Sequence, residues 1–112
     1  MSPEDVVAEQ LAAYNARDLD RFLSCYIEDV PVHAFPSGVE LTDRSGPRFR
    51  ERYEALFASS PNLHAELLSR VAHGRIVIDQ ELVTGFNNSE TRAAAAMYEV
   101  HEDKITRVWF IE

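Results

Sequence analysis

Residues 75–85, RIVIDQELVTG, predict a β-strand whose two faces differ. Side chains alternate along a strand, so residues two apart share a face. One face therefore carries Val77, Asp79, Glu81 and Val83, while the other face is mostly apolar. Two acids among valines either face water or line a pocket. Most of what the sequence indicates about function depends on that choice.

A second strand is expected over residues 64–73, joined to the first by a two-residue turn at His73–Gly74. In this register Asp79 opposes Leu68. One face of the hairpin then carries His64, Glu66, Arg70, Asp79 and Glu81. The other face carries Ala65, Leu67, Val71, Ile76, Ile78 and Leu82.

The first part of the chain predicts helices. Ser2 can cap a helix whose first turn holds Pro3 and two acids. The stretch NARD at 15–18 interrupts the apolar spacing, and a second, shorter helix is expected over 19–26. A third helix follows Pro47.

Strands account for the remainder. Residues 30–35, VPVHAF, look extended, and Pro31 favours an edge strand. Beyond the first hairpin, strands are expected over 92–101 and 104–111. Helices followed by an antiparallel meander predict an α+β fold, with one curved sheet wrapped around a layer of helices.

Composition narrows the class of protein. The length of 112 residues suggests one domain, residues 1–112. The net charge of −8 argues against nucleic acid and anionic membranes as partners, because both require basic patches. The single cysteine, Cys25, allows no internal disulfide and is expected to be a buried, small hydrophobic residue. No signal-peptide pattern or membrane-length apolar run is seen, so a cytoplasmic location is expected.

Three stretches together resemble the nuclear transport factor 2-like superfamily, which includes SnoaL-like cyclases and ketosteroid isomerase. They are LAAYNARDLDRFLSCYIEDV (11–30), RSGPRFRERY with its helix (44–53) and YEVHEDKITRVWFIE (98–112). The resemblance covers essentially the whole chain. It implies a cone-shaped, cystatin-like fold with an internal pocket, and a homodimer formed through the convex face of the sheet. The superfamily contains enzymes, binding modules and transport adaptors, so the resemblance does not choose a function.

Ketosteroid isomerases use an aspartate base, with a tyrosine and a protonated aspartic acid as an oxyanion hole. By position, the base falls on Ala34 or Phe35, the tyrosine on Gln10 and the second acid on Ala96. All three groups are missing from this chain. Any isomerase-like chemistry must therefore come from other residues.

The resemblance places Asp79, Glu81 and Val83 on the concave face, which lines the pocket. The two carboxylates would lie about 7 Å apart along the strand. In a half-dry cavity they cannot both stay ionised without compensation. Either Arg70 and His64 hold them, or one has the raised pKa that general acid–base catalysis requires. A solvated face or a purely structural arginine–carboxylate network remains the alternative.

Other side chains are weaker candidates for the site. Tyr98 could donate to a ligand oxygen, with Ala94 and Ala96 leaving room beside it, and His33 could act near the mouth of the cavity. Core packing is the simpler interpretation of Tyr98, and a structural or exposed position is that of His33. The candidates for catalysis are thus Asp79, Glu81, Tyr98 and His33, and those for ligand contact are Tyr14, Tyr26, His64, Arg70, Val83 and Trp109.

A basic cluster surrounds the start of the third helix, at Arg44, Arg48, Arg50 and Arg52. It is interpreted either as a solvated face or as a weak anion contact. No metal-ligand spacing, phosphate-binding glycine loop or nucleophile motif is found, so no metal or cofactor is expected.

The leading hypothesis is a homodimer that binds a small organic molecule in a mostly apolar pocket. If it is an enzyme, it performs cofactor-free proton transfer such as isomerisation, dehydration, cyclisation or epoxide opening. A non-catalytic binding module and a dimeric interaction module are the alternatives. The sequence does not decide whether residues 36–46 cover the pocket.

Overall fold

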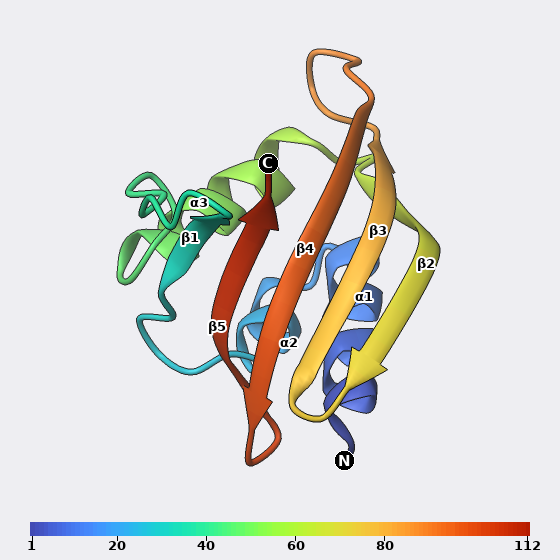
Figure 1. Ribbon diagram of the computed structural model, residues 1–112. Helices are drawn as coiled ribbons and strands as arrows, with labels where there is room; N and C mark the ends of the chain where they lie inside the picture. Colours follow the sequence, from blue (N-terminus) through green and yellow to red (C-terminus); the bar gives the residue numbers. More distant parts are fainter.

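Helices gather on one side of a five-stranded sheet in the computed structural model, which describes residues 1–112 (Figure 1). The helices are α1 (Pro3–Ala16), α2 (Leu19–Leu23) and α3 (Arg48–Ser59). The strands are β1 (Val32–Phe35), β2 (His64–His73), β3 (Ile76–Thr84), β4 (Arg92–His101) and β5 (Lys104–Ile111). The predicted α+β fold with a curved sheet is confirmed.

The sheet has the order β1-β5-β4-β3-β2. Strands β2 to β5 form the predicted antiparallel meander. At the edge, β1 lies parallel to β5, with Val32 beside Val108, so one parallel pair is added to the predicted antiparallel meander. Parallel neighbours require a long connection, and α3, β2, β3 and β4 lie between these two strands in the chain.

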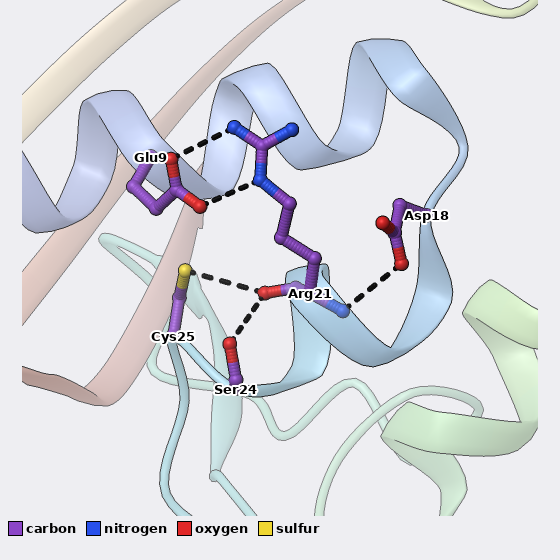
Figure 2. Close-up of polar contacts among 5 residues, drawn as sticks. All are labelled: Glu9, Asp18, Arg21, Ser24 and Cys25. Carbon is purple, nitrogen blue, oxygen red and sulfur yellow. Dashed lines mark hydrogen bonds and ion pairs between the residues drawn. The ribbon is translucent and has the colours of Figure 1, made fainter.

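Helix α2 is tied to α1 by an ion pair at the surface (Figure 2). The Arg21 guanidinium donates two hydrogen bonds to the Glu9 carboxylate, at 2.6 and 2.9 Å. The Asp18 side chain caps α2 by accepting from the Arg21 backbone N–H. The Arg21 carbonyl accepts hydrogen bonds from Ser24 and Cys25 where the helix ends. Helix α2 is therefore shorter than the predicted 19–26.

Cys25 is buried, as expected from its apolar surroundings. Burial raises the pKa of its thiol above the usual value. A thiol that stays protonated is a poor nucleophile, so Cys25 acts as a packing residue.

Side chains of the NARD stretch (15–18) form hydrogen bonds that hold the end of α1 against the start of β2. The Asn15 side chain accepts a hydrogen bond from the Ala65 N–H at 2.7 Å and donates one to the Ala65 carbonyl at 3.1 Å. Arg17, in the left-handed conformation that ends α1, donates to the Leu63 carbonyl at 2.8 Å. Asn15 therefore satisfies both backbone groups of an edge-strand residue that no neighbouring strand can reach.

The β2–β3 hairpin differs from the predicted register. Its turn is Gly74–Arg75, with Gly74 at a φ of 58°, and Arg70 lies directly opposite Asp79. A β-bulge at Leu68 then shifts the pairing by one residue. Because one extra residue reverses the alternation beyond it, Ala65 is buried against the helices.

The prediction for the polar face of this hairpin is therefore wrong at the end away from the turn. The bulge places His64 and Glu66 on the convex face, where both are exposed. Arg70 remains on the concave face with Asp79 and Glu81.

The concave face of the sheet packs on the helices. Val77, Asp79, Glu81 and Val83 all lie on it and are buried, so the two acids do not face bulk water. Beneath them, aromatic rings from all three helices pack edge to face or tilted: Tyr14, Phe22, Tyr53 and Phe57. Phe22 and Phe57 belong to the hydrophobic core, and Tyr14 and Tyr53 are partly buried and pack against it.

The convex face carries a continuous apolar row across four strands. Val71 pairs with Ile78, Ile78 with Met97, and Met97 with Trp109. No helix covers this face (Figure 1), and Val71 is 61% exposed. None of the three helices has both the length and the apolar character needed to cross a membrane.

Candidate functional site

A cavity of about 180 Å³ lies between the concave face and the helices. Eleven of its sixteen lining residues are hydrophobic. Its lining consists of Gln10, Leu11, Tyr14, Phe22, Arg44, Arg52, Leu56, Ala65, Glu81, Val83, Phe86, Arg92, Ala93, Ala94, Tyr98 and Phe110. Small alanines on β4 lie opposite the acid-bearing strand, since Glu81 pairs with Ala94. Because alanine side chains are small, space remains there for a small molecule.

Glu81 is the one acid in this lining. It is 8% exposed, and its Oε2 atom is buried with no hydrogen-bond partner. Burial raises the pKa of the Glu81 carboxyl to about 7, with the Asp79 charge acting in the same sense and Arg70 opposing it. A carboxyl group with this pKa is present in both protonation states near neutral pH, as general acid–base catalysis requires.

Asp79 is fully buried but has a complete partner. Arg70 Nε and Nη2 donate to its two carboxylate oxygens at 2.7 and 2.9 Å. Such a bidentate pair satisfies both charges and fixes the two strands in register. Neither residue lines the cavity. The two acids therefore have different environments, one neutralised by arginine and the other unpartnered beside a cavity.

Three tyrosines surround the cavity in different ways. Tyr98 and Tyr14 line it directly, and burial raises the pKa of both phenols, so both remain protonated hydrogen-bond donors. The Tyr26 hydroxyl is used internally, since it donates to Gln10 Oε1 at 2.8 Å. Gln10 lines the cavity, and Tyr26 supports it from behind.

Three of the predicted site residues lie on the other side of the sheet. His33 on β1 is paired with Trp109 on β5, and both alternate with core residues that face the helices. Trp109 instead packs under the Arg107 guanidinium. His64 is on the same convex face because of the β-bulge. None of the three lines the cavity.

The sequence did not indicate several residues that line the cavity. Arg44 and Arg52 had been interpreted only as part of a basic cluster, and Arg92 and Phe86 carried no local signal. Arg92 reaches the cavity because the first residue of β4 lies near the helical layer. No spacing within β4 could reveal this contact.

Chemically, the cavity offers a carboxyl group, two phenols, an amide and three guanidinium groups among apolar side chains. No group of three or more His, Cys, Asp or Glu side chains is placed to hold a metal ion. The arrangement suits an organic molecule that exchanges a proton with Glu81 and accepts a hydrogen bond from a phenol.

Replacing Arg70 by Met should destabilise the protein strongly, because Asp79 would remain buried without its partner. The expected loss is about 3–5 kcal/mol in the free energy of unfolding, measured by urea denaturation. Arg21→Met removes a bidentate pair of similar geometry from the surface and should cost much less. Equal losses for the two variants would contradict the view that Asp79 depends on Arg70.

Replacing Glu81 by Gln should stabilise the protein increasingly as the pH rises. The folded-state pKa of about 7 lies above the ordinary 4.5, so the wild-type fold favours the protonated acid. Below pH 4.5 Glu81 is protonated in both states, whereas above pH 7 the fold must contain a buried charge. Between about pH 5 and pH 8 the advantage of the variant should grow by on the order of 2–3 kcal/mol.

Urea unfolding of both proteins over this pH range measures the difference. Glu66→Gln removes an exposed acid from the opposite face and is the matched control. A stability difference that stays constant with pH for Glu81→Gln would show that its carboxyl titrates normally.

Solved structures share the fold over nearly the whole chain. An uncharacterized cystatin-fold protein from Novosphingobium aromaticivorans is 30% identical, with a TM-score of 0.86 and coverage of 100% of this chain and 99% of that one. IdmH from Streptomyces antibioticus, a candidate polyketide cyclase, is 18% identical, with a TM-score of 0.80 and coverage of 99% and 91%. A candidate ketosteroid isomerase from Kribbella flavida is 14% identical, with a TM-score of 0.78 and coverage of 97% and 76%.

Among curated proteins, none matches this sequence. The family model described as the SnoaL-like domain matches residues 7–108. This match includes β1 to β4, the first part of β5 and most of the residues that line the cavity. The chain therefore belongs to the SnoaL-like domain family, within the nuclear transport factor 2-like fold.

Proposed function

We propose that this protein binds a small, largely apolar organic molecule beside Glu81 and transfers a proton to or from it without a cofactor. The observation that carries the proposal is the buried, unpartnered Oε2 atom of Glu81 in an otherwise apolar and aromatic lining. A buried polar atom without a partner is costly and rare, so it calls for an explanation. The names of two structural relatives, a candidate cyclase and a candidate isomerase, fit this class of chemistry.

In the proposed reaction, ionised Glu81 removes a proton from a carbon atom next to a carbonyl group. The electron pair moves into the carbonyl, and Tyr98 or Tyr14 donates a hydrogen bond to the oxygen as it gains negative charge. Protonated Glu81 then returns the proton to a different carbon, which completes an isomerisation. If the proton goes instead to a leaving hydroxyl, water departs and the product is a dehydrated molecule. The carboxyl ends each cycle ionised, as it began.

The cavity wall contributes by excluding water. Val83, Phe86, Leu56 and Phe110 surround the polar groups with apolar surface. Electrostatic interactions inside such a wall are stronger than in water, which favours stabilisation of a developing oxyanion.

A non-catalytic binding module is the second candidate. It is favoured by the residues at the three isomerase positions, Gln10, Ala34 and Ala96, none of which can act as an acid or base. In that case Glu81 would serve as a hydrogen-bonding partner for a ligand and not as a proton carrier.

The two candidates are separated by proton exchange. Wild-type protein should accelerate deuterium incorporation at the carbon next to the carbonyl of small cyclic ketones in D₂O, followed by proton NMR. The rate should rise through about pH 7 as Glu81 ionises. Glu81→Gln should abolish the acceleration, and Glu66→Gln should leave it unchanged. Ketones that bind to the wild type but exchange no faster than with Glu81→Gln would favour the binding module.

We further propose that a second copy of this chain covers the convex face. An exposed apolar surface of this kind usually marks an interface. The row Val71, Ile78, Met97 and Trp109 continues across four strands. At its side, Glu99 and Arg107 are cross-strand partners of opposite charge. A two-fold axis makes a patch meet itself, so a face with both signs of charge complements its own copy.

Val71→Glu should convert the dimer to a monomer, because it places a charge within the apolar row that the second copy would cover. Size-exclusion chromatography with light scattering measures the mass. Ala72→Glu adds the same charge one residue along the strand, at an exposed position on the opposite face, and should leave the dimer intact. A wild-type protein that is monomeric at micromolar concentration would contradict this proposal.

A further inference from the structure

The cavity mouth is positively charged in a protein that is strongly acidic overall. The chain has 19 acidic and 11 basic residues, yet three arginines line this one cavity. They come from separate segments: Arg44 precedes α3, Arg52 lies within α3, and Arg92 begins β4. Asp43 pairs with Arg44 and Arg52, and Glu90 pairs with Arg92, so these two acids offset part of the repulsion among the three positive charges.

Arg52 and Arg92 lie at the entrance to the cavity. A shallow surface depression adjoins the cavity and shares four lining residues with it, Arg52, Leu56, Phe86 and Arg92. Both guanidinium charges also act on the Tyr14 hydroxyl, where they oppose the dominant effect of burial on its pKa. The two arginines therefore line one opening and lie within electrostatic reach of the same phenol.

Arg52 and Arg92 each keep N–H donors that the neighbouring acids do not use. Arg52 Nη1 contacts Asp43 at 2.8 Å, and Arg92 contacts Glu90 through Nε and Nη2 at 2.8 and 2.9 Å. Both carboxylates are largely exposed to solvent. A guanidinium has five N–H donors, so each arginine retains donors beyond these contacts.

Aromatic rings hold two of the guanidinium groups that line the cavity. Arg92 lies 4.7 Å from the centre of the Phe86 ring, and Arg44 lies 5.3 Å from that of Phe110. Both rings are themselves part of the cavity lining. A guanidinium stacked on a ring is oriented before a ligand arrives, which lowers the entropy lost on binding.

The interior of the cavity favours the uncharged end of a ligand. Its only acid, Glu81, lies within the lining with one oxygen unpartnered, so a ligand anion would be repelled there and attracted at the mouth. The volume of about 180 Å³ is close to that of an engineered cavity of about 150 Å³ that binds benzene. A single ring therefore matches the size of this space.

We propose that the ligand is a small monocyclic carboxylate whose ring occupies the cavity beside Glu81 and whose anionic group lies between Arg52 and Arg92. The proposal rests on the proposed function, because it takes the cavity beside Glu81 as the ligand site. It adds the charge, the size and the orientation of the ligand. In this orientation the ring carbons are nearest to the acid–base group and the carboxylate remains at the entrance.

Benzoate and its neutral isostere benzamide test the proposal by NMR titration of the folded protein. Benzoate should bind about tenfold or more tightly than benzamide, as expected for charge-assisted hydrogen bonds. High salt should reduce that preference. Both probes should shift the carboxyl-carbon signal of Glu81, because both place a ring beside it.

Arg52→Gln and Arg92→Gln should each weaken benzoate binding about tenfold and leave benzamide binding unchanged. Arg48→Gln removes the same charge from an exposed position on the same helix, outside the cavity, and is the matched control. The two mouth arginines are partly exposed, so these variants should keep the wild-type melting temperature.

Equal affinity for benzoate and benzamide, with a shifted Glu81 signal, would overturn the carboxylate proposal and leave the proposed function intact. Benzoate binding that does not move the Glu81 signal would overturn the carboxylate proposal, because the anion would then bind only at the surface. If benzamide also leaves the Glu81 signal unmoved, the proposed function is overturned as well, because no ring then enters the cavity. An Arg48→Gln effect as large as that of Arg52→Gln would also overturn the carboxylate proposal, since general charge would explain it.

Discussion

Two carboxylates buried on one face of one strand are the constraint on which the rest of this structure depends. A charge cannot be buried without a partner, a hydrogen bond or a shifted pKa. Asp79 is stabilised by Arg70, at 2.7 Å on the adjacent strand. That pairing requires Arg70 to lie directly opposite Asp79, so the buried acid and the hairpin register depend on each other.

Glu81 lies two residues farther along and has no such partner. The β-bulge at Leu68 places Leu67 opposite it, and Ala94 is its neighbour on the other side. Neither side chain can neutralise a carboxylate, so its pKa rises and a cavity remains beside it. The same strand therefore contains a structural acid and a titratable one, and the difference comes only from the neighbouring strands.

The helical layer completes this arrangement. Asn15 and Arg17 attach the end of α1 to the start of β2, which holds Tyr14 and Gln10 against the sheet. The apolar walls and the arginines at the mouth then give the cavity two unlike ends. A ligand that matches both must be amphipathic, with an apolar part that enters first. Local polarity, rather than the net charge of the whole chain, decides which molecules fit.

Much of the fold could be predicted from the sequence. Capping residues, apolar spacing and turn residues indicated the helices and strands, and the predicted bounds of β2, β4 and β5 agree with the structure. These signals are local, since each depends on residues within one or two turns of the chain. The unusual position of Asp79 and Glu81 among valines was visible for the same reason.

The partners of those acids could not be predicted from neighbouring residues in the sequence. A hairpin turn displaced by one residue and one bulge moved His64 and Glu66 to the convex face, and strand alternation placed His33 and Trp109 there too. The sequence by itself determined the elements and the acid-bearing strand. Only the tertiary structure decided that Asp79 is paired, that Glu81 is not, and that Arg92 reaches the cavity mouth. The physical reason is that pKa values and cavities depend on neighbours brought together by strand pairing and helix packing, and these neighbours are distant in the chain.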